Sequence, residues 1–513
     1  MHVFETVIVL LLIGAALAAL ARRIGAPYPA LLALAGAAIA LMPGVAPVTL
    51  DPELALALFV APVLLDAAFD ASPRDLRHNW RPVAGLALVT VAVTVAAVAA
   101  TARWMVPELP WAAAVALGAI VAPPDAAAAT AVLRPLRPPH RLLVILEGES
   151  LFNDASALLI YRLAVAAAAG AISGWSIVPT LLLVTVGSVV LGLVLARVTI
   201  RLTTRIEDVP TAVIVQFVGT FGVWIIAERL HLSGILTMVV YAMSVARTAP
   251  DVIPARIRIP SYAVWEVAVF LLNALAFILV GLQLKPIVRE LGRATLVEYI
   301  GIALVVCAAV ILVRIAWVLG THLVRGPRTP VARRHAIVMA WAGMRGTVTL
   351  AAALALPAGF PHRDLILFTA FSVVLGTLVA QGLTLKPIMA WLGLEHDDSV
   401  EREVRLARVE ALRAGAAALG DAAGETDSTD LLRRKYRVRL ERAESRLAGT
   451  GSAGRPENGA RAYATAARAA MAAERRRLSE LRADGTIGDD AFHRIEEELD
   501  RAELGAEAME PED

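Results

Sequence analysis

The stretch Leu146-Glu147-Gly148-Glu149-Ser150-Leu151-Phe152-Asn153-Asp154 lies inside a long apolar run that extends over residues 141–169. It places three carboxylates within eight residues, where a hydrophobic helix would otherwise be uninterrupted. A charged side chain at membrane depth is costly, so acids in such a run mark a functional site by default. We therefore expect this segment to bind a ligand.

The rest of the chain supports a membrane setting for this segment. Of the 513 residues 58% are hydrophobic, whereas soluble domains average about 45–50% apolar residues. Residues 1–394 are apolar with charges at intervals, and residues 395–513 are rich in Arg, Glu, Asp and Ala. We predict an all-α polytopic membrane domain over 1–394 and a helical cytoplasmic tail over 395–513. The net charge of +2 gives no support for a nucleic-acid partner.

Apolar runs long enough to cross the lipid bilayer recur along the first 394 residues. About 20 residues span the hydrocarbon core, and longer runs must tilt or extend beyond it. Thirteen runs are predicted to be transmembrane helices, at residues 4–21, 27–43, 52–71, 82–104, 109–131, 141–169, 174–202, 209–229, 232–248, 260–284, 295–323, 332–357 and 364–393.

Positive charge is concentrated in every second connection between these runs. The odd-numbered connections hold most of the arginines, for example the groups within 74–81, 134–141 and 197–205, whereas the even-numbered ones hold few. Arginine and lysine are enriched in cytoplasmic loops. We therefore predict a multi-pass protein of a bacterial-type inner (plasma) membrane, with its N-terminus outside and its tail in the cytoplasm.

Helical phase separates the acids of the opening stretch. Ser150 and Asp154 are four residues apart and share a face, and Glu147 nearly shares it. Glu149 lies roughly 140° around the helix from Asp154, at about 100° per residue. Glu149 and Asp154 are therefore predicted to have different roles.

Two other apolar runs contain helix breaks. Pro123 and Pro124 remove two backbone donors, and Asp125 follows them in position to cap a second half-helix. Gly343 and Gly346 flank an arginine in a later run. Broken backbone at membrane depth is tolerated where it is buried by protein or lines a wet cavity, and paired interrupted helices point to a transporter site.

Further acids lie in the third and tenth runs. Asp66 and Asp70 share a helical face, as do Glu266 and Asn273. Asp70, Glu147 and Glu266 are near run ends, so they either extend to water or form a cytoplasmic funnel. Histidine spacing gives no metal site, and no catalytic triad or nucleotide-binding glycine motif occurs in the membrane part. We predict no cofactor and no enzymatic activity.

These motifs together resemble one family. The stretches Gly118–Asp125, Glu147–Asp154 and Gly343-Met344-Arg345-Gly346 are similar to the NhaP and sodium/proton exchanger branch of the monovalent cation:proton antiporters. Leu65–Ala68 and Trp265–Asn273 also look like its third and tenth helices. The similarity covers nearly the whole membrane domain, in order.

The resemblance implies inverted six-helix repeats, two crossed broken helices and a homodimer. It implies that Asp154 binds the cation and the proton in turn, and that its Asn-Asp form exchanges them electroneutrally, one for one. Asn153 and Asp125 would stabilise the break, with Ser150 and Asp66 near the ion. It also implies a structural ion pair between Glu149 and Arg345. Two simpler interpretations stay open, in which Asp125 only caps a helix and Arg345 is only a structural partner that does not contact the ion.

The expected substrate is sodium, with potassium or lithium as alternatives, and the expected roles are pH homeostasis and sodium tolerance. Two departures from the family pattern weaken the inference of ion preference from the resemblance. Pro124-Asp125-Ala126 stands where the family commonly has Thr-Asp-Pro, and Asp66 stands where many members carry Glu. A cation channel or a K⁺/H⁺ exchanger with the same fold remains the alternative function.

The tail is predicted to form helices at about 398–421, 428–448, 458–484 and 488–506, with breaks at glycine-rich segments between them. Two interpretations stay open. The helices either pack as a solvated amphipathic hairpin, or form a regulatory domain that senses pH or joins protomers.

Overall fold

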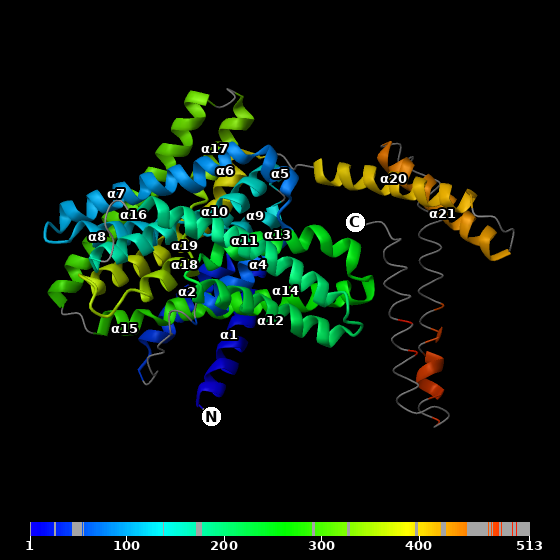
Figure 1. Cartoon of the computed structure of the whole chain (residues 1–513), viewed down its shortest axis with the longest axis horizontal. Helices are drawn as coiled ribbons and strands as arrows, with labels where there is room; N and C mark the ends of the chain where they lie inside the picture. The colour runs from blue at the N-terminus through cyan, green and yellow to red at the C-terminus, as the bar shows by residue number, and fades with distance from the viewer. Residues whose placement is uncertain are drawn as a thin grey trace. The chain divides into compact units, whose positions relative to one another are not determined.

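The computed structural model describes residues 2–24, 27–43, 54, 56–136, 138–170, 177–289, 293–325, 329–394, 399–421 and 427–448, with single residues and short pieces between 470 and 499. The chain divides into two compact units, Met1–Asp397 and Asp398–Asp513. The described elements are helical in both units (Figure 1).

The first unit contains helices at each of the thirteen predicted runs. They are α1 (His2–Ile24), α2 (Tyr28–Leu41), η1 (Leu56–Val60) with α4 (Ala61–Asp70), α5 (Pro73–His78), α6 (Trp80–Ala84) with η2 (Gly85–Thr90) and α7 (Val91–Met105), α8 (Trp111–Val121), α9 (Ala126–Leu133) with η3 (Arg134–Leu136), α10 (His140–Ala168), α11 (Ile177–Thr203), α12 (Val209–Arg229), α13 (Gly234–Val252), α14 (Ala255–Leu282), α15 (Leu284–Arg289), α16 (Arg293–Arg325), α17 (Pro330–Trp341), α18 (Thr347–Leu354) and α19 (Arg363–Leu392).

Among the described residues, eight helices are long and apolar enough to cross a membrane, and three shorter apolar helices accompany them. The count of thirteen crossings therefore stays a prediction.

Local chemistry sets many helix ends. Asp208 and Ser233 cap α12 and α13 through their side chains, as N-terminal caps commonly do. Gly393 ends α19 in the left-handed conformation, which costs glycine nothing.

The helices of the first unit pack as two bundles. The site bundle comprises α7, α8, α9, α10, α16, α17, α18 and α19, and the support bundle comprises α1, α2, α4, α11, α12, α13 and α14. A buried apolar cluster joins α7, α8, α10, α16 and α19 inside the first bundle, and another joins α4, α11, α12 and α13 inside the second. The bundles meet where α2 and α14 face α9, α17 and α19.

Within the support bundle, α2 and α14 contact each other through their backbones. A Cβ atom at Gly36 would lie 2.1 Å from the carbonyl oxygen of Ile278, and one at Gly281 would lie 2.2 Å from that of Ala33. No side chain fits at such distances, so both positions require glycine. We call this contact the glycine seam.

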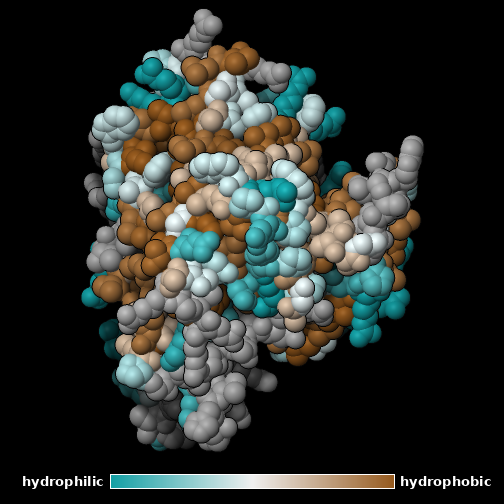
Figure 2. Space-filling view, turned by 90° about the vertical axis from the view of Figure 1, so that its left-hand side faces the viewer, coloured by the Kyte–Doolittle hydropathy of each residue, from teal (hydrophilic) through white to brown (hydrophobic). Residues whose placement is uncertain are grey.

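Large hydrophobic side chains cover much of the surface of the first unit. On the face shown in Figure 2, hydrophobic residues form broad stretches, with hydrophilic residues in separate patches. Leu182, Leu183 and Val186 of α11 and Val297 and Leu304 of α16 are each more than half exposed. Apolar exposure on this scale is expected of a surface that faces lipid.

The second unit contains α20 (Ser399–Asp421) and α21 (Asp427–Leu447), which pack against each other. Val409, Leu412 and Ala443 are buried between them, and Arg413 pairs with Glu444 across the two helices at 2.7 Å. The predicted hairpin is therefore present for the first two tail helices. The predicted helices at 458–484 and 488–506 lie almost wholly outside the described residues.

Candidate functional site

The two predicted breaks interrupt their helices and cross each other. One run of helix ends at Val121 and resumes at Ala126, and the other ends at Trp341 and resumes at Thr347. The backbone N–H of Asp125 donates a hydrogen bond to the carbonyl oxygen of Met344 at 2.7 Å. The crossed broken helices of the predicted fold are thus confirmed, and a direct backbone bond joins them.

Asp125 serves both half-helices that begin at this crossing. Its Oδ1 atom accepts from the N–H groups of Ala127 at 2.8 Å and Ala128 at 3.4 Å, which caps α9. The backbone N–H of Thr347, at the start of α18, also interacts with this carboxylate. A Cβ atom at Gly346 would lie 1.6 Å from Asp125 Oδ2, so the absence of a side chain there admits the carboxylate.

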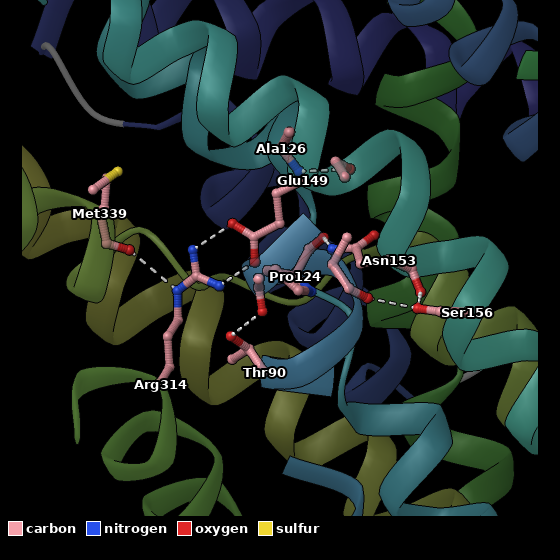
Figure 3. A network of polar contacts seen from close by, with 11 residues as sticks. Thr90, Pro124, Ala126, Glu149, Asn153, Ser156, Arg314 and Met339 are labelled. Atoms are coloured by element: carbon pink, nitrogen blue, oxygen red, sulfur yellow. Dashed lines mark hydrogen bonds and ion pairs between the residues drawn. The ribbon is translucent and has the colours of Figure 1, made fainter. Parts of the chain in front are cut away.

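The acidic stretch of α10 lies beside the first break. Asn153 is fully buried, and its Nδ2 atom donates to the carbonyl oxygen of Pro124 at 3.1 Å (Figure 3). This bond satisfies a carbonyl that the broken helix leaves without an internal partner. Ser150 Oγ accepts from the N–H of Ala126 at 3.3 Å. Both residues therefore support the break, as the resemblance implied for Asn153.

Asp154 is 6% exposed, and among the described residues no group donates a hydrogen bond to its carboxylate. Its side chain lines a cavity of about 270 Å³. Asp125 and Ser150 line the same cavity from the site bundle, while Asp66 and Asn273 line it from the support bundle. The structure thus brings all five predicted ion-site residues, including the neighbouring Asn153, to one place between the bundles.

A second cavity of about 730 Å³ adjoins the first, with Asp66, Asp70, Arg134 and Asn273 lining both. Glu266 lines the larger cavity, and Glu147 lines the smaller one, where it pairs with Arg134 at 3.0 Å. The three acids predicted as a funnel therefore line these two adjoining cavities. Their part in ion passage stays a prediction.

The expected ion pair between Glu149 and Arg345 is replaced by a different one. Glu149 contacts Arg314 of α16 through two hydrogen bonds, at 2.5 Å and 2.8 Å, and Arg314 Nε donates to the carbonyl oxygen of Met339 (Figure 3). Both side chains are buried. A parallel pair of bonds from a guanidinium to a carboxylate is the favoured geometry for such burial. Gly343 makes room for it, since a Cβ atom there would lie 2.5 Å from Arg314 Cδ.

Arg345 is 1% exposed, and its Nε and Nη1 atoms have no hydrogen-bond partner among the described residues. Its backbone N–H donates to Thr377 Oγ1 at 3.0 Å, which fixes the second break against α19. Glu149, Arg314 and Asp154 all act on its guanidinium electrostatically. Arg345 therefore contributes a positive charge that acts on Asp154 without an ion pair to any of the described residues.

Arg314 was not predicted, although the sequence carries a signal for it. It lies in the middle of the apolar run 295–323, whose other charged residue, Glu298, is near the start, and the criterion that singled out the acids of α10 applies to Arg314 equally. No group of three or more His, Cys, Asp or Glu residues that could hold a metal ion occurs in the described part of the chain. The site instead offers carboxylate, hydroxyl and carbonyl oxygens, which suit hard cations.

Comparison with known proteins agrees with this geometry. Residues 8–391 match the family model of the transmembrane sodium/hydrogen exchangers. An uncharacterized Na⁺/H⁺ exchanger of Mycobacterium bovis is 32% identical over 86% of this chain and 84% of its own length. A sodium, potassium, lithium and rubidium/H⁺ antiporter of Bacillus subtilis is 31% identical over 76% of this chain and 62% of its own length.

The solved structure of the sodium proton antiporter MjNhaP1 from Methanocaldococcus jannaschii has the same fold. It superposes with a TM-score of 0.62 at 18% sequence identity, over 74% of this chain and 99% of that chain. Crossed broken helices, a buried aspartate between two bundles and a match over the membrane unit point the same way. The chain belongs to the sodium/hydrogen exchanger family of multi-pass cation:proton antiporters and is a transporter, not an enzyme.

Proposed function

We propose that this antiporter exchanges one monovalent cation for one proton at Asp154, and that sodium is its principal cation. The observation that carries the proposal is the state of its carboxylate, which is buried, faces a cavity and receives no hydrogen bond among the described residues. A carboxylate left without internal donors needs a proton or a cation to offset its burial. Because it cannot hold both at once, competition at Asp154 couples the two fluxes.

The charges around the crossing support a one-for-one exchange. In the site bundle, where Arg134 already pairs with Glu147, three carboxylates at the crossing, those of Asp125, Glu149 and Asp154, stand against two guanidiniums, those of Arg314 and Arg345. The sum is one negative charge when all five are ionised. Either one proton or one monovalent cation neutralises it, and a neutral buried cluster costs least. Loaded in either way, the site therefore moves through the membrane without net charge.

The oxygen lining of the smaller cavity favours hard alkali cations. The Bacillus subtilis relative is named as an antiporter of potassium, lithium and rubidium as well as sodium. We therefore include potassium and lithium as further substrates of this chain. Sodium tolerance and pH homeostasis in a bacterial plasma membrane are the physiological roles that fit such exchange.

The site lies between the bundles, so rocking of one bundle against the other would open it alternately to either side, as in other inverted-repeat transporters. In the orientation predicted from charge, the joined cavities open to the cytoplasm and the N-terminus lies outside. A homodimer would keep the support bundles fixed while the site bundles move.

A cation channel is the competing function, because an open cavity with acids would also conduct ions. The measurement that separates them is proton movement in everted vesicles that are acidified inside and then given Na⁺, K⁺ or Li⁺ outside. We expect each transported cation to release protons from the vesicles, and the rate to be unchanged when a membrane potential is imposed or collapsed.

Asp154→Asn should abolish this exchange while leaving the protein folded, because the amide retains the volume but cannot carry the proton. Asp364→Asn, at an exposed position on α19, serves as the matched control and should exchange normally. Robust cation-driven proton release by Asp154→Asn would refute the site. A rate that follows the membrane potential would refute the one-for-one ratio, and conduction without uphill proton movement would favour a channel.

A further inference from the structure

Arg162 connects α10 to the turn between α12 and α13. Its Nη2 atom contacts both carboxylate oxygens of Glu228, at 2.7 Å and 2.6 Å, and its Nη1 atom donates to the carbonyl oxygen of Leu232 at 3.1 Å. One guanidinium thus holds both the end of α12, through Glu228, and the turn that follows it, through Leu232. Neither the acidic cluster nor the helix breaks require this contact.

The contact joins the two bundles at the end opposite to the cavities. Arg162 belongs to the site bundle, whereas Glu228 and Leu232 belong to the support bundle. Arg162 follows Asp154 by eight residues, or about 12 Å along the helix axis. Glu147, which lines the smaller cavity, precedes Asp154 by a similar distance in the other direction. The joined cavities therefore lie at one end of the site, and the Arg162 contact lies at the other.

The turn presents its acceptors rigidly. His231 has a positive φ of 55°, and the N–H of Leu232 donates back to the carbonyl oxygen of Ala227 at 2.9 Å. The N–H of Ser233 donates to Ser188 Oγ of α11 at 2.9 Å. A Cβ atom at Gly234 would lie 3.0 Å from Glu228 Oε1, so this glycine lets the carboxylate lie close to the turn.

We propose that Arg162 and Glu228 form a latch that holds the transporter with Asp154 open to the side of the two cavities. The transport consequence rests on the function proposed above. Opening the site at the other end requires the bundles to separate there, and the three contacts of Arg162 must then break. Both residues act through the position of the bundles, so they are positioning residues and do not touch the ion.

The latch is of moderate strength. The side chains of Arg162 and Glu228 are 42% and 36% exposed, and solvent weakens ion pairs at such positions. We expect its loss to shift the balance between the two orientations by roughly fivefold. A shift of this size leaves the protein folded and able to transport, while reducing access to Asp154 from the cavity side.

The test measures this access without measuring transport. Cys307 is the chain's single cysteine, so Cys307→Ala combined with Ala131→Cys leaves one thiol, on a residue that lines the smaller cavity. Everted vesicles expose the side predicted to be cytoplasmic to a membrane-impermeant maleimide. Glu228→Gln and Arg162→Gln, introduced separately, should slow labelling, by at most about fivefold, and Arg162→Lys, which keeps the charge, should label at most of the unaltered rate.

Arg413→Gln is the matched control, because it removes an ion pair of similar exposure within the tail unit. It should label at the unaltered rate. Unchanged labelling in the isosteric Glu228→Gln variant would overturn the latch, as would slow labelling in the Arg162→Lys variant. The outcome is independent of the proposed exchange: a change in labelling supports the latch even if Asp154→Asn still transports, and unchanged labelling refutes it even if Asp154→Asn is inactive.

Discussion

The two helix breaks reach the same geometry by opposite chemistry. The break between α8 and α9 is made by two prolines and is capped by the side chain of Asp125. The break between α17 and α18 is made by glycines, and its N-cap residue, Gly346, has no side chain with which to cap. The second half-helix therefore depends on Asp125 from the first break, whose carboxylate also meets the amide of Thr347.

This asymmetry shows how one carboxylate can organise two half-helices. A proline break supplies rigidity and a side chain, and a glycine break supplies the space for that side chain to enter. The glycine break also brings a positive charge, Arg345, beside Asp154. The difference between the breaks can be tested from either side of the crossing.

The largest effect is expected from Gly346→Ala. The added methyl group would lie 1.6 Å from Asp125 Oδ2, so the carboxylate must leave its place and α18 loses its cap. We expect the free energy of unfolding to fall by about 3 kcal/mol or more, because the cost of forced overpacking and the cost of the lost cap add to each other. Thermal unfolding in detergent measures the loss. Gly301→Ala in α16, which meets nothing within 4 Å, should be neutral, and a neutral Gly346→Ala would contradict the shared cap.

Breaking the ion pair beside the glycine break should have an effect of similar size. Glu149→Gln leaves Arg314 buried without its counter-charge, and the removal of one partner of a buried pair costs about 3–5 kcal/mol. Glu149→Gln combined with Arg314→Met should recover most of the loss. If Glu149→Gln with Arg345→Met recovered it instead, the partner of Glu149 would be Arg345. Thermal stability of the purified variants decides between them.

Asp125→Asn should lower stability least, because asparagine caps one helix about as well as aspartate does, but its single acceptor oxygen cannot serve both α9 and α18. We expect a loss of about 1 kcal/mol in the free energy of unfolding and slower exchange, because the charge balance at the site changes. An unchanged free energy of unfolding would show that α18 does not depend on the second carboxylate oxygen. Unfolding and vesicle exchange are measured on the same preparation.

The sequence predicted what local chemistry decides. Prolines, glycines and a following aspartate located both breaks, and helical phase separated Glu149 from Asp154, which the structure places in an ion pair and in a cavity respectively. Apolar runs located the helices. The prediction that the two breaks cross rested on the family resemblance, because nothing in either segment alone specifies contact with the other.

The partner of Glu149 could not be read from the sequence alone. Glu149 and Arg314 are 165 residues apart, and helical phase gives a direction around one helix but not which helix lies there. Arg314 and Arg345 both lie well inside apolar runs of the later half of the membrane unit, so either could have been the partner. Packing decided between them, since Gly343 leaves space for Arg314 to reach Glu149. The same limit left Arg162 without a predicted partner.

The glycine seam between α2 and α14 has a mechanical consequence. Two helices in backbone contact cannot slide past each other by a fraction of a turn, because the next residues in line carry side chains that do not fit. The pair therefore behaves as a stiff strut, and any displacement during a transport cycle falls on the softer, side-chain-mediated boundary with the site bundle. The rigid contact between α2 and α14 thus confines movement to the boundary between the two bundles.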